Sequence, residues 1–361
     1  MNILILANND IGLYKFRKEL LEELLKNNKV YFCVPYGEHV EKIKSLGCKY
    51  IKTEMDRRGI NPFVDLKLVL RYDKIVKKLK PDLVITYTIK PNIYGSFICR
   101  LNKISCAVNI TGLGTAFDRG GVLKKIVVGM YKMACKKAKV IFFENSYNQK
   151  VFIDAGICEI KRTKVLNGAG VNLVDYSYQE YPKNDNVKFL FVGRVMKEKG
   201  VDELFTATKR LVEQGMKCSL DVVGPFEEDY KKKLEIYESE GWLNYYGYQD
   251  DVRPFIKQCD CFVLPSHHEG MANTNLESAA SGRPIITSNI PGCCEAIIDG
   301  ESGFLFEKYD ARKLEDAMKK MIKLSCKERE KMGLIGREYM KKVFDKDKVV
   351  RETILGLGLR G

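Results

Sequence analysis

The chain has 361 residues, 45% of them hydrophobic and 30% charged, which is typical of a folded globular protein and excludes a disordered one. It is long enough for two domains, and no apolar run approaches the roughly 20 residues of a membrane-spanning helix. The net charge of +14 comes from one half: residues 1–175 contain 31 Lys and Arg against 16 Asp and Glu, and residues 176–361 contain 30 against 31. This imbalance favours an anionic partner for the first half, such as a nucleic acid, a membrane surface or a phosphorylated substrate, and a face of solvated lysines explains it equally well.

Apolar runs of strand length alternate with amphipathic segments of helix length along the chain. This alternation predicts an α/β protein with two doubly wound, Rossmann-like domains that face each other across a cleft. Ligands of such sheets bind beyond the carboxyl ends of the strands, so the chemistry is sought in the residues that follow each strand. The predicted strands are 3–7, 30–34, 83–88, 106–110 and 140–143 in the first half and 188–192, 220–223, 261–264 and 285–287 in the second, and the predicted helices include 16–25 and 66–79.

A polar stretch separates the two sets of strands. Residues 172–186 contain three tyrosines and a proline and have no periodic pattern, which is typical of a linker. We therefore predict an acceptor-binding N-terminal domain at residues 1–171 and a nucleotide-binding domain at 187–344. Residues 345–361 are expected to form a helix that returns to the N-terminal domain.

The twelve cysteines are scattered, and none of their spacings matches a zinc site. The chain begins with an apolar run that lacks the basic lead and the cleavage site of a signal peptide. These features predict reduced cysteines and a cytoplasmic location. His267 and His268 are adjacent and therefore point in different directions, so we expect no metal site there.

The loop after the strand at 188–192 is suited to a diphosphate. It carries Gly193, Arg194 and Lys199 and leads into a helix that begins near Asp202. The helix N-terminus offers unpaired N–H groups and positive potential, Arg194 a planar fork and Lys199 a point charge. A solvated basic turn is the equally weighted alternative, because lysine is abundant in this chain.

The loop after the strand at 261–264 carries Glu269, and a short helix that begins near Thr274 carries Glu277. Thr274-x-x-Glu277 also fits a capping box, in which Glu277 would have a structural role. Two glutamates eight residues apart mean little by themselves. Their position around a helix start, after a strand and downstream of the basic loop, makes them candidate ligands.

This series of motifs, continued by residues 288–305, resembles glycosyltransferase family 4, which has the GT-B fold. The resemblance covers nearly all of the second domain. It implies that Glu269 binds hydroxyls of a donor sugar, that Glu277 binds the ribose of the nucleotide, and that Arg194 and Lys199 neutralise the departing diphosphate. Further residues that it places at the nucleotide sugar are Gly193, Gly270, the backbone N–H groups of Asn273, Thr274 and Asn275, and the turns at Gly224–Pro225 and Gly247–Tyr248 beside the base.

The resemblance also implies a reaction, the retaining transfer of a hexose or N-acetylhexosamine from a UDP-sugar. The glycosyl bond breaks through an oxocarbenium-like state, with Arg194 and Lys199 stabilising the departing oxygen and Glu269 as the third catalytic candidate. No side chain is an obvious nucleophile, so the diphosphate is expected to take the proton of the acceptor. The nucleotide sugar is a substrate, and we expect no cofactor and no obligatory metal.

Three loops of the first half, each after a strand, are similar to those of a subgroup that builds bacterial surface glycans. That subgroup includes N-acetylgalactosaminyltransferases that extend sugars on undecaprenyl diphosphate, which implies a polyprenyl-diphosphate-linked acceptor. Gly12 is expected to let the first loop approach a diphosphate, and Lys90 and Thr111 are expected to bind substrate. Many family members have a histidine where this chain has Thr111.

Residues 121–140 combine apolar positions with six lysines, which is typical of a basic amphipathic helix on an anionic bilayer. A core helix with a solvated lysine face is the alternative. We expect a peripheral position on the inner face of the cytoplasmic membrane. Two other functions stay open: a sugar-nucleotide epimerase of GT-B fold, and a nucleic-acid-binding protein that uses the basic half, although no RNA-binding motif supports the latter.

Overall fold

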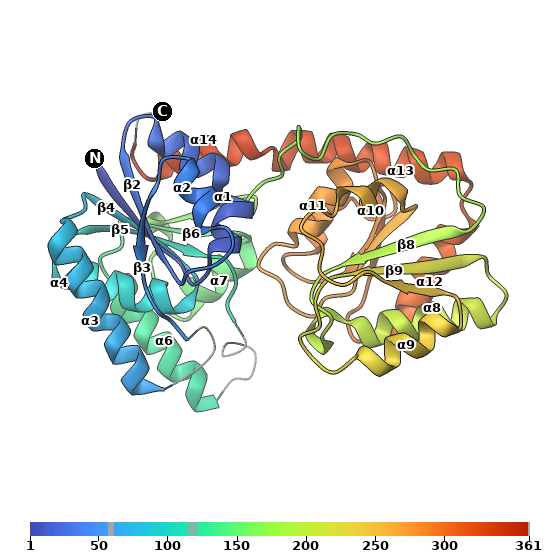
Figure 1. The fold of residues 1–361 in the computed structure, drawn as a ribbon, viewed down its shortest axis with the longest axis horizontal. Coiled ribbons are helices and arrows are strands. Elements are labelled where there is room, and N and C mark those ends of the chain that lie inside the picture. Colours follow the sequence, from blue (N-terminus) through green and yellow to red (C-terminus); the bar gives the residue numbers. More distant parts are fainter. Residues whose placement is uncertain (57–60, 115–116, 118–120, 360–361) are drawn as a thin grey trace. The chain divides into compact units, whose positions relative to one another are not determined.

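The computed structural model describes residues 1–56, 61–114, 117 and 121–359. The chain divides into two compact units, Met1–Ala169 together with Lys346–Gly361, and Gly170–Asp345. Each unit is a parallel sheet covered by helices (Figure 1). The predicted α/β class with two Rossmann-like domains is therefore confirmed.

The described part of the first unit contains a seven-stranded sheet in the order β3-β2-β1-β4-β5-β6-β7. All of its neighbouring strands are parallel. Its strands are β1 Asn2–Leu6, β2 Lys29–Val34, β3 Lys49–Lys52, β4 Leu83–Tyr87, β5 Ser105–Ile110, β6 Val140–Phe143 and β7 Thr163–Val165. Its helices are α1 Asp10–Leu25, α2 Val40–Ser45, α3 Pro62–Leu79, α4 Ser96–Leu101, α6 Gly121–Cys135, α7 Ser146–Asp154 and α14 Lys346–Gly356, with a π-helix η1 Pro91–Gly95 and a 3-10 turn η2 Ile160–Arg162.

The alternation of side chains along the central strand β1 places different helices on the two faces of this sheet. Ile3 and Ile5 pack with α1, α2 and α14 on one face. Leu4 and Leu6 pack with α3, α4, α6 and α7 on the other. The C-terminal helix α14 thus belongs to the first unit, where it packs against α1.

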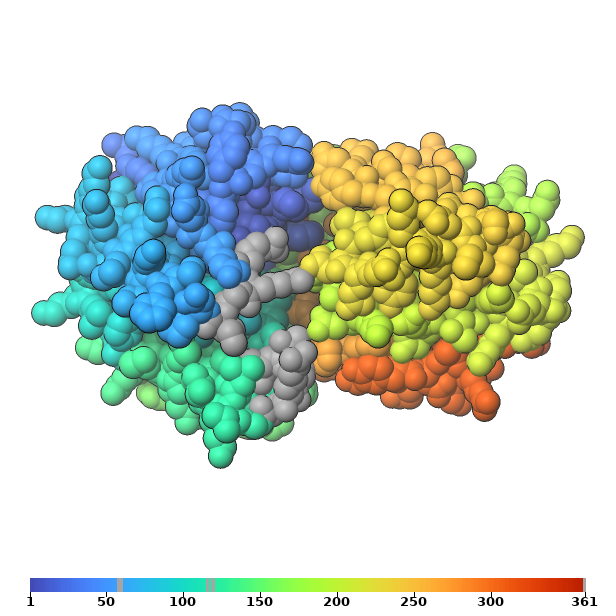
Figure 2. All heavy atoms as spheres, turned by 60° about the horizontal axis from the view of Figure 1, so that its bottom comes forward, coloured from blue at the N-terminus to red at the C-terminus, as the bar shows by residue number. Residues whose placement is uncertain are grey.

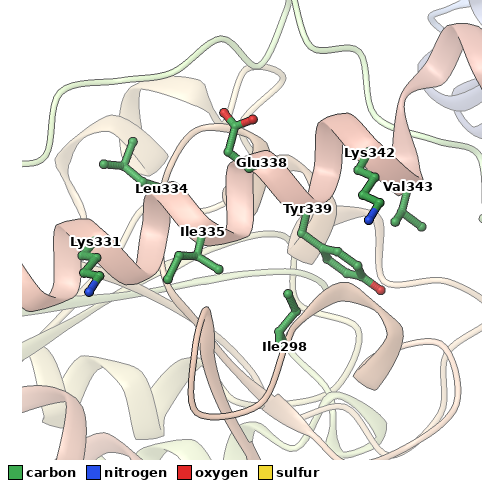
Figure 3. Close-up of a pocket in the computed structure, with 8 residues that line it drawn as sticks. All are labelled: Ile298, Lys331, Leu334, Ile335, Glu338, Tyr339, Lys342 and Val343. Carbon is green, nitrogen blue, oxygen red and sulfur yellow. The ribbon is translucent and has the colours of Figure 1, made fainter.

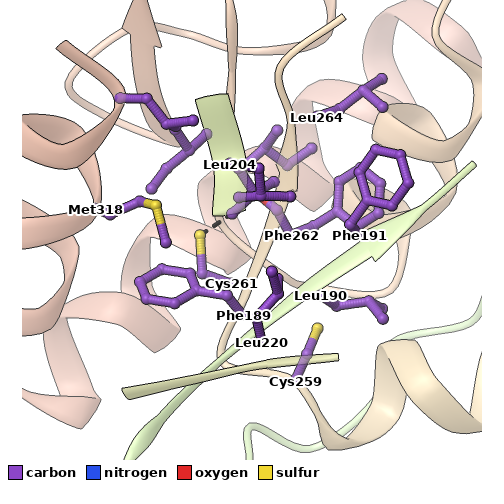
Figure 4. Packing of buried hydrophobic residues seen from close by; sticks show 14 of the residues in the cluster. Phe189, Leu190, Phe191, Leu204, Leu220, Cys259, Cys261, Phe262, Leu264 and Met318 are labelled. Carbon is purple, nitrogen blue, oxygen red and sulfur yellow. Dashed lines mark hydrogen bonds between the residues drawn. The ribbon is translucent and has the colours of Figure 1, made fainter. Parts of the chain in front are cut away.

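The described part of the second unit contains a six-stranded parallel sheet in the order β10-β9-β8-β11-β12-β13. Its apolar centre is formed by β8, β9 and β11. Phe189 and Phe191 of β8 and Phe262 of β11 are fully buried there (Figure 4). Its strands are β8 Val187–Val192, β9 Cys218–Val223, β10 Leu243–Tyr245, β11 Cys261–Leu264, β12 Ile285–Ser288 and β13 Gly303–Phe306. Its helices are α8 Val201–Glu213, α9 Lys231–Ser239, α10 Arg253–Gln258, α11 Asn273–Ala280, α12 Ala311–Lys323 and α13 Cys326–Tyr339, with 3-10 turns η3 Lys197–Lys199 and η4 Cys294–Ala296 and a π-helix η5 Met340–Phe344.

The segment 172–186, which its composition marks as a linker, is packed against the second unit. The phenol of Tyr181 is buried and donates a hydrogen bond of 2.6 Å to the Asp260 carbonyl. The guanidinium of Arg283, fully buried beneath the segment, donates to the carbonyls of Gln179 and Glu180 at 3.0 and 2.9 Å. These bonds satisfy polar backbone groups that would otherwise cost free energy on burial, so an aperiodic polar segment can lie against a folded domain.

No helix in the described ranges is long and apolar enough to cross a membrane. All twelve cysteines are unpaired thiols, and nine of them are buried. The nine buried cysteines therefore act as small apolar side chains of the two cores.

Candidate active site

Two loops at the carboxyl edge of the second sheet are locked together at Gly200. Strands β8 and β11 are parallel neighbours, so the loops that follow them leave the sheet side by side. Gly200 has φ +68°, and a Cβ built on it would lie 2.0 Å from the carbonyl oxygen of Pro265. The His267 N–H also donates to the Glu198 carbonyl at 2.9 Å. Only glycine fits this left-handed position and this backbone approach, which fixes the distance between the two loops.

A third loop, which follows β12, packs against the backbone of the loop that carries Glu269. A Cβ on Gly292 would lie 2.7 Å from the Glu269 carbonyl oxygen and 2.8 Å from that of Gly270. The Ala272 N–H donates to the Gly292 carbonyl at 2.7 Å. The loop that carries Glu269 is thus held by backbone contacts on two sides.

These contacts bring Lys199 and Glu269 together. The ammonium of Lys199 donates a hydrogen bond to Oε1 of Glu269, and the Ser266 hydroxyl donates to the same oxygen at 2.7 Å. The Lys199 and Glu269 side chains are 18% and 14% exposed, so water or a ligand can reach both. Two of the three predicted catalytic residues therefore meet at the carboxyl ends of β8 and β11, with Ser266 as an additional partner.

Arg194 lies elsewhere on the same edge. Its guanidinium is 3.4 Å from a carboxylate oxygen of Glu227, and its side chain is 43% exposed. An exposed ion pair of this type contributes little to stability, so an anionic ligand can compete for the guanidinium at low cost. Among the described contacts, Arg194 is paired with Glu227 and is not joined to the Lys199–Glu269 pair.

The helix that carries Glu277 begins differently from the prediction. The N-cap of α11 is Ala272, which makes no side-chain cap, and Thr274 is already inside the helix. The predicted capping box is therefore wrong: the N-cap is Ala272, two residues before Thr274, and its N–H is bonded to the Gly292 carbonyl of the loop after β12. Glu277 therefore has no capping role.

Glu277 has a partner that is distant in sequence, Tyr176 of the segment 172–186. Burial raises the pKa of Tyr176, and the neighbouring charge of Glu277 and a hydrogen bond to that carboxylate raise it further. The backbone holds Tyr176 in place, since its N–H donates to the Asn172 carbonyl at 2.9 Å and its carbonyl accepts from Arg337 at 3.2 Å. Tyr176 thus orients the carboxylate of Glu277.

The asparagines at the start of α11 are engaged within the protein. The Asn273 N–H donates to the Met271 carbonyl and the Asn275 N–H to the Ala272 carbonyl, both at 3.0 Å. The Asn275 side chain is fully buried and donates to the Thr287 hydroxyl at 3.0 Å. The N–H groups of Asn273 and Asn275 thus bond within the protein, and the expectation that the N–H groups of Asn273, Thr274 and Asn275 face a diphosphate stays a prediction.

Gly193, Gly224 and Gly247 join the ends of β8, β9 and β10. A Cβ on Gly224 would lie 1.9 Å from the Gly193 carbonyl oxygen, and the Gly224 N–H donates to the Gly247 carbonyl at 2.8 Å. Tyr248 follows and is 49% exposed, with its hydroxyl 3.5 Å from Asp250. An exposed aromatic ring beside a tight glycine turn offers a flat surface on which a base can stack.

Gly12 is not a loop residue. It lies in the first turn of α1, and its N–H donates to the side-chain oxygen of the N-cap Asn9 at 2.6 Å. Asn9 is one of the residue types that cap helices, so the helix begins earlier than the apolar pattern predicts. Gly12 therefore lies at the start of a helix and not in the loop before it, and its expected approach to a diphosphate stays a prediction.

Lys90 lies after β4 and is held by Asp65 of α3. Its ammonium is 2.7 Å from one Asp65 oxygen, and the Tyr94 hydroxyl donates to the other at 2.8 Å. Between the strand and Lys90, Thr88 has φ +71°, a left-handed conformation that is unusual for a residue with a branched side chain. Thr111 follows β5, which pairs with β4, so Lys90 and Thr111 come from neighbouring strand ends.

The sequence reasoning missed Arg17 and Glu144 of the first unit. The Arg17 guanidinium donates to Glu144 at 2.5 Å and lies 5.1 Å from the centre of the Tyr87 ring. Both charged side chains are largely buried. Glu144 directly follows β6, so the rule that selected the other loops would also have selected it. Arg17 and Tyr176 carry no local signal of this type.

His267 lies against a carboxylate. Its Nε2 is 3.2 Å from Glu203 of α8, and its ring lies 3.9 Å from that of Tyr309. Burial by itself raises the pKa of Glu203, but the neighbouring His267 ring and a backbone N–H together lower it more, so that pKa lies below its usual value. The described residues contain no cluster of three or more His, Cys, Asp or Glu arranged to hold a metal ion.

A groove of about 570 Å³ lies on the second unit along α13 and η5. Ile335 and Tyr339 of α13 face Ile298 across it, and Lys331 and Lys342 stand at its ends (Figure 3). It contains none of the residues that follow β8 or β11. The groove is therefore separate from the candidate active site.

Two family models match the chain. Residues 2–145 match the "Glycosyl transferase 4-like" model, and residues 177–339 match the "Glycosyl transferases group 1" model. The two matches correspond to the two units, and the residues brought together after β8 and β11 fall within the second match.

Several of the proteins similar to this chain are bacterial glycosyltransferases. The N,N'-diacetylbacillosaminyl-diphospho-undecaprenol alpha-1,3-N-acetylgalactosaminyltransferase of Campylobacter jejuni is 28% identical over 89% of each chain. The UDP-Gal:alpha-D-GlcNAc-diphosphoundecaprenol alpha-1,3-galactosyltransferase of Escherichia coli is 28% identical over 70% of this chain and 69% of its own. Anabaena Alr3699/HepE, solved in complex with UDP and glucose, superposes with a TM-score of 0.80 at 16% identity over 99% of both chains, which shows the shared fold.

Proposed function

The chain belongs to the GT-B glycosyltransferases that join a 4-like first domain to a group 1 second domain, and from this premise we propose that it is a retaining enzyme that uses a UDP-sugar. It moves a hexose or N-acetylhexosamine to a polyprenyl-diphosphate-linked glycan during the assembly of a bacterial surface polysaccharide. The donor class is supported by the UDP-Gal in the name of the Escherichia coli relative, and the acceptor class by the diphospho-undecaprenol in the names of both relatives.

One observation carries the proposal: Lys199 and Glu269 meet at the carboxyl ends of two adjacent parallel strands, where such sheets bind nucleotides. In the free protein the carboxylate of Glu269 is satisfied by Lys199 and Ser266. When the donor binds, hydroxyls of its sugar take the place of some of the hydrogen bonds that Glu269 accepts in the free protein. The ammonium of Lys199 is then available to an oxygen of the diphosphate.

The transfer follows from this change of partners. The bond between the anomeric carbon and the diphosphate oxygen breaks, and its electron pair leaves with UDP. Lys199 and Arg194 stabilise the negative charge on that oxygen, which is where fixed cationic donors lower the barrier most. The acceptor hydroxyl attacks the face that the diphosphate vacates, and its proton passes to the departing phosphate oxygen. Glu277, oriented by Tyr176, binds the ribose hydroxyls of the nucleotide.

The lipid-linked acceptor requires the enzyme to work at a membrane surface. We propose a cytoplasmic protein, bound peripherally through its basic first half, that needs neither a cofactor nor an obligatory metal. Lys90 and Thr111, from neighbouring strand ends of the first unit, are the candidates for the acceptor's phosphates and sugar.

A product screen tests this function. Purified protein is incubated with individual UDP-sugars, with and without a short polyprenyl-diphosphate saccharide, and the products are read by mass spectrometry. We expect one added sugar residue on the acceptor and only slow hydrolysis of the donor alone. Rapid conversion of the donor without acceptor would assign the chain to the epimerases instead, and no turnover with any UDP-sugar would reject the donor class.

A further inference from the structure

Two helices of the first unit expose large apolar side chains where a water-facing surface would carry polar ones. Phe63 of α3 is 77% exposed and Val122 of α6 is 74% exposed. At helical spacing, Phe63, Leu66 and Leu70 form one stripe on α3, and Val122, Ile126 and Met133 form one stripe on α6. We refer to these six residues as the α3–α6 surface.

Both stripes face away from the sheet on the same side of the unit. The opposite sides of the two helices, which carry Leu68 and Tyr72 on α3 and Tyr131 and Cys135 on α6, pack into a single apolar cluster on one face of the sheet. Both helices also contact α4 and η1, so they lie in one layer. Figure 1 shows α3 and α6 together on this layer, and in Figure 2, where the layer is turned forward, both are visible on the same face of the unit.

The charge around the stripes is almost entirely positive. Residues 121–140 contain six lysines and no acidic residue. On α3, Lys67, Lys74 and Lys78 follow the apolar stripe along the helix, whereas its two acidic residues are engaged, Asp65 by Lys90 and Asp73 by Lys77. In α6 the core side is apolar, and the exposed side combines apolar residues with lysines.

We propose that the α3–α6 surface docks on a bilayer that contains anionic phospholipid, with the apolar stripes entering the headgroup region and the lysines contacting lipid phosphates. The surface also includes helix α3, which the amphipathic pattern of residues 121–140 alone does not predict. A protein partner or a second copy would have to offer an acidic rim around an apolar centre, and the near absence of unpaired acidic residues on the two helices makes the surface a poor match for itself. The inference rests on the proposed lipid-linked acceptor, which the docked enzyme would meet at the membrane.

Vesicle binding tests the surface. Full-length protein is sedimented with vesicles of phosphatidylcholine alone or mixed with phosphatidylglycerol, at low and high salt. We expect binding to the mixed vesicles that weakens with salt. Because each lysine at an anionic surface contributes on the order of fivefold in affinity, Lys125→Glu with Lys132→Glu is expected to weaken binding by about tenfold or more. Phe63→Ser with Ile126→Ser is expected to lower binding by about tenfold through loss of apolar insertion.

Matched variants on the second unit serve as controls. Lys232→Glu with Ile236→Ser changes an exposed lysine and an exposed apolar residue of α9, and it is expected to leave binding unchanged. Circular dichroism and thermal unfolding check that each variant folds. Equal binding of wild type to neutral vesicles, or wild-type binding by both α3–α6 variants, would overturn the proposal. A wild-type dimer that Ile126→Ser dissociates would assign the surface to a second copy and overturn it as well.

The same variants separate this inference from the proposed function. With an acceptor whose lipid chain is short enough to dissolve in water, the α3–α6 variants are expected to retain wild-type turnover. Loss of vesicle binding together with retained turnover supports both proposals. Specific vesicle binding without turnover of any UDP-sugar would reject the function and leave the docking surface standing.

Discussion

The ammonium of Lys199 and the carboxylate of Glu269 form a hydrogen-bonded ion pair between the loops that follow β8 and β11. The pair remains within reach of water or a ligand, and it keeps one positive and one negative group at a strand edge. A nucleotide sugar needs both, because it carries hydroxyls that bind carboxylates and a diphosphate that binds ammonium groups. The proposed mechanism depends on this exchange of partners.

Replacing Lys199 tests its role at the leaving group. We expect Lys199→Ala to lower kcat by about 10²–10³, the usual cost of removing one donor that stabilises a developing oxyanion. Lys199→Arg is the matched control, since it keeps the charge and changes its geometry, and it should retain more activity. Steady-state kinetics with saturating acceptor gives the comparison. An unchanged kcat in Lys199→Ala would show that the diphosphate leaves without this group.

Tyr176→Phe removes the hydroxyl that orients Glu277 and leaves the partly buried ring in place. A hydrogen bond to a charged group contributes about 1.5–3 kcal/mol, so UDP is expected to bind about tenfold or more weakly to this variant. Because Tyr176 acts through Glu277, the KM for the donor should rise while kcat changes little. Titration calorimetry with UDP measures the binding.

The control for this change is Tyr178→Phe. Tyr178 lies two residues along the same segment, and its hydroxyl is bonded to Glu330 at 3.3 Å. It should leave UDP binding as in wild type. Equal affinities for all three proteins would show that Tyr176 has only a packing role.

Gly200→Ala tests the contact that locks the two site loops. Any L-residue at φ +68° is strained by about 1–2 kcal/mol, and here the added Cβ would also lie 2.0 Å from the Pro265 carbonyl oxygen. Gly215→Ala is the matched control, because Gly215 has φ +75° and no atom lies within 4 Å of its Cβ position. We expect Gly200→Ala to lose at least about 2 kcal/mol more in free energy of unfolding than the control, measured by urea denaturation.

A second consequence of Gly200→Ala is separation of the loops. The variant should therefore bind UDP more weakly than Gly215→Ala under conditions in which both are folded. Identical unfolding free energies for the two variants would contradict the close approach of Gly200 to Pro265.

The Glu203–His267 pair predicts a dependence of stability on pH. The pKa of Glu203 is lowered in the folded protein, so its contribution to stability is present above the usual glutamate pKa of about 4.3 and is lost as the pH falls through the lowered value. Glu203→Gln cannot make this contribution. The Tm difference between wild type and Glu203→Gln should therefore shrink as the pH is lowered from neutral into this acid range. A difference that is constant across that range would show that the pair does not depend on the charge of Glu203.

The sequence predicted those parts of the fold that leave a local pattern. Buried central strands such as β1 and β8 are continuous apolar runs, and they were found with their boundaries within one or two residues. Edge strands β3 and β7 are short and their side chains are only partly buried, so no apolar run marks them. Burial on both faces, and not strand formation itself, is what produces the recognisable pattern.

The residues of the candidate site were likewise predictable only where a local sequence pattern marks them. Lys199 and Glu269 were selected because each follows a strand, a rule that depends only on local sequence. Tyr176 was assigned to a linker, because its contact with Glu277 is set by how the segment 172–186 packs on the second unit. The start of α11 was misjudged for a similar reason, since the loop after β12 determines it through Gly292.

The central claim is that the chain transfers a sugar from UDP with retention at the anomeric carbon, and the anomeric configuration of the product tests it most directly. Proton NMR of the saccharide formed from an α-linked UDP-sugar would report the new linkage through its anomeric coupling. The account predicts an α linkage for wild type, and the same linkage at a lower rate for Lys199→Ala. A β linkage would contradict it, because the acceptor would then have attacked the face opposite the diphosphate.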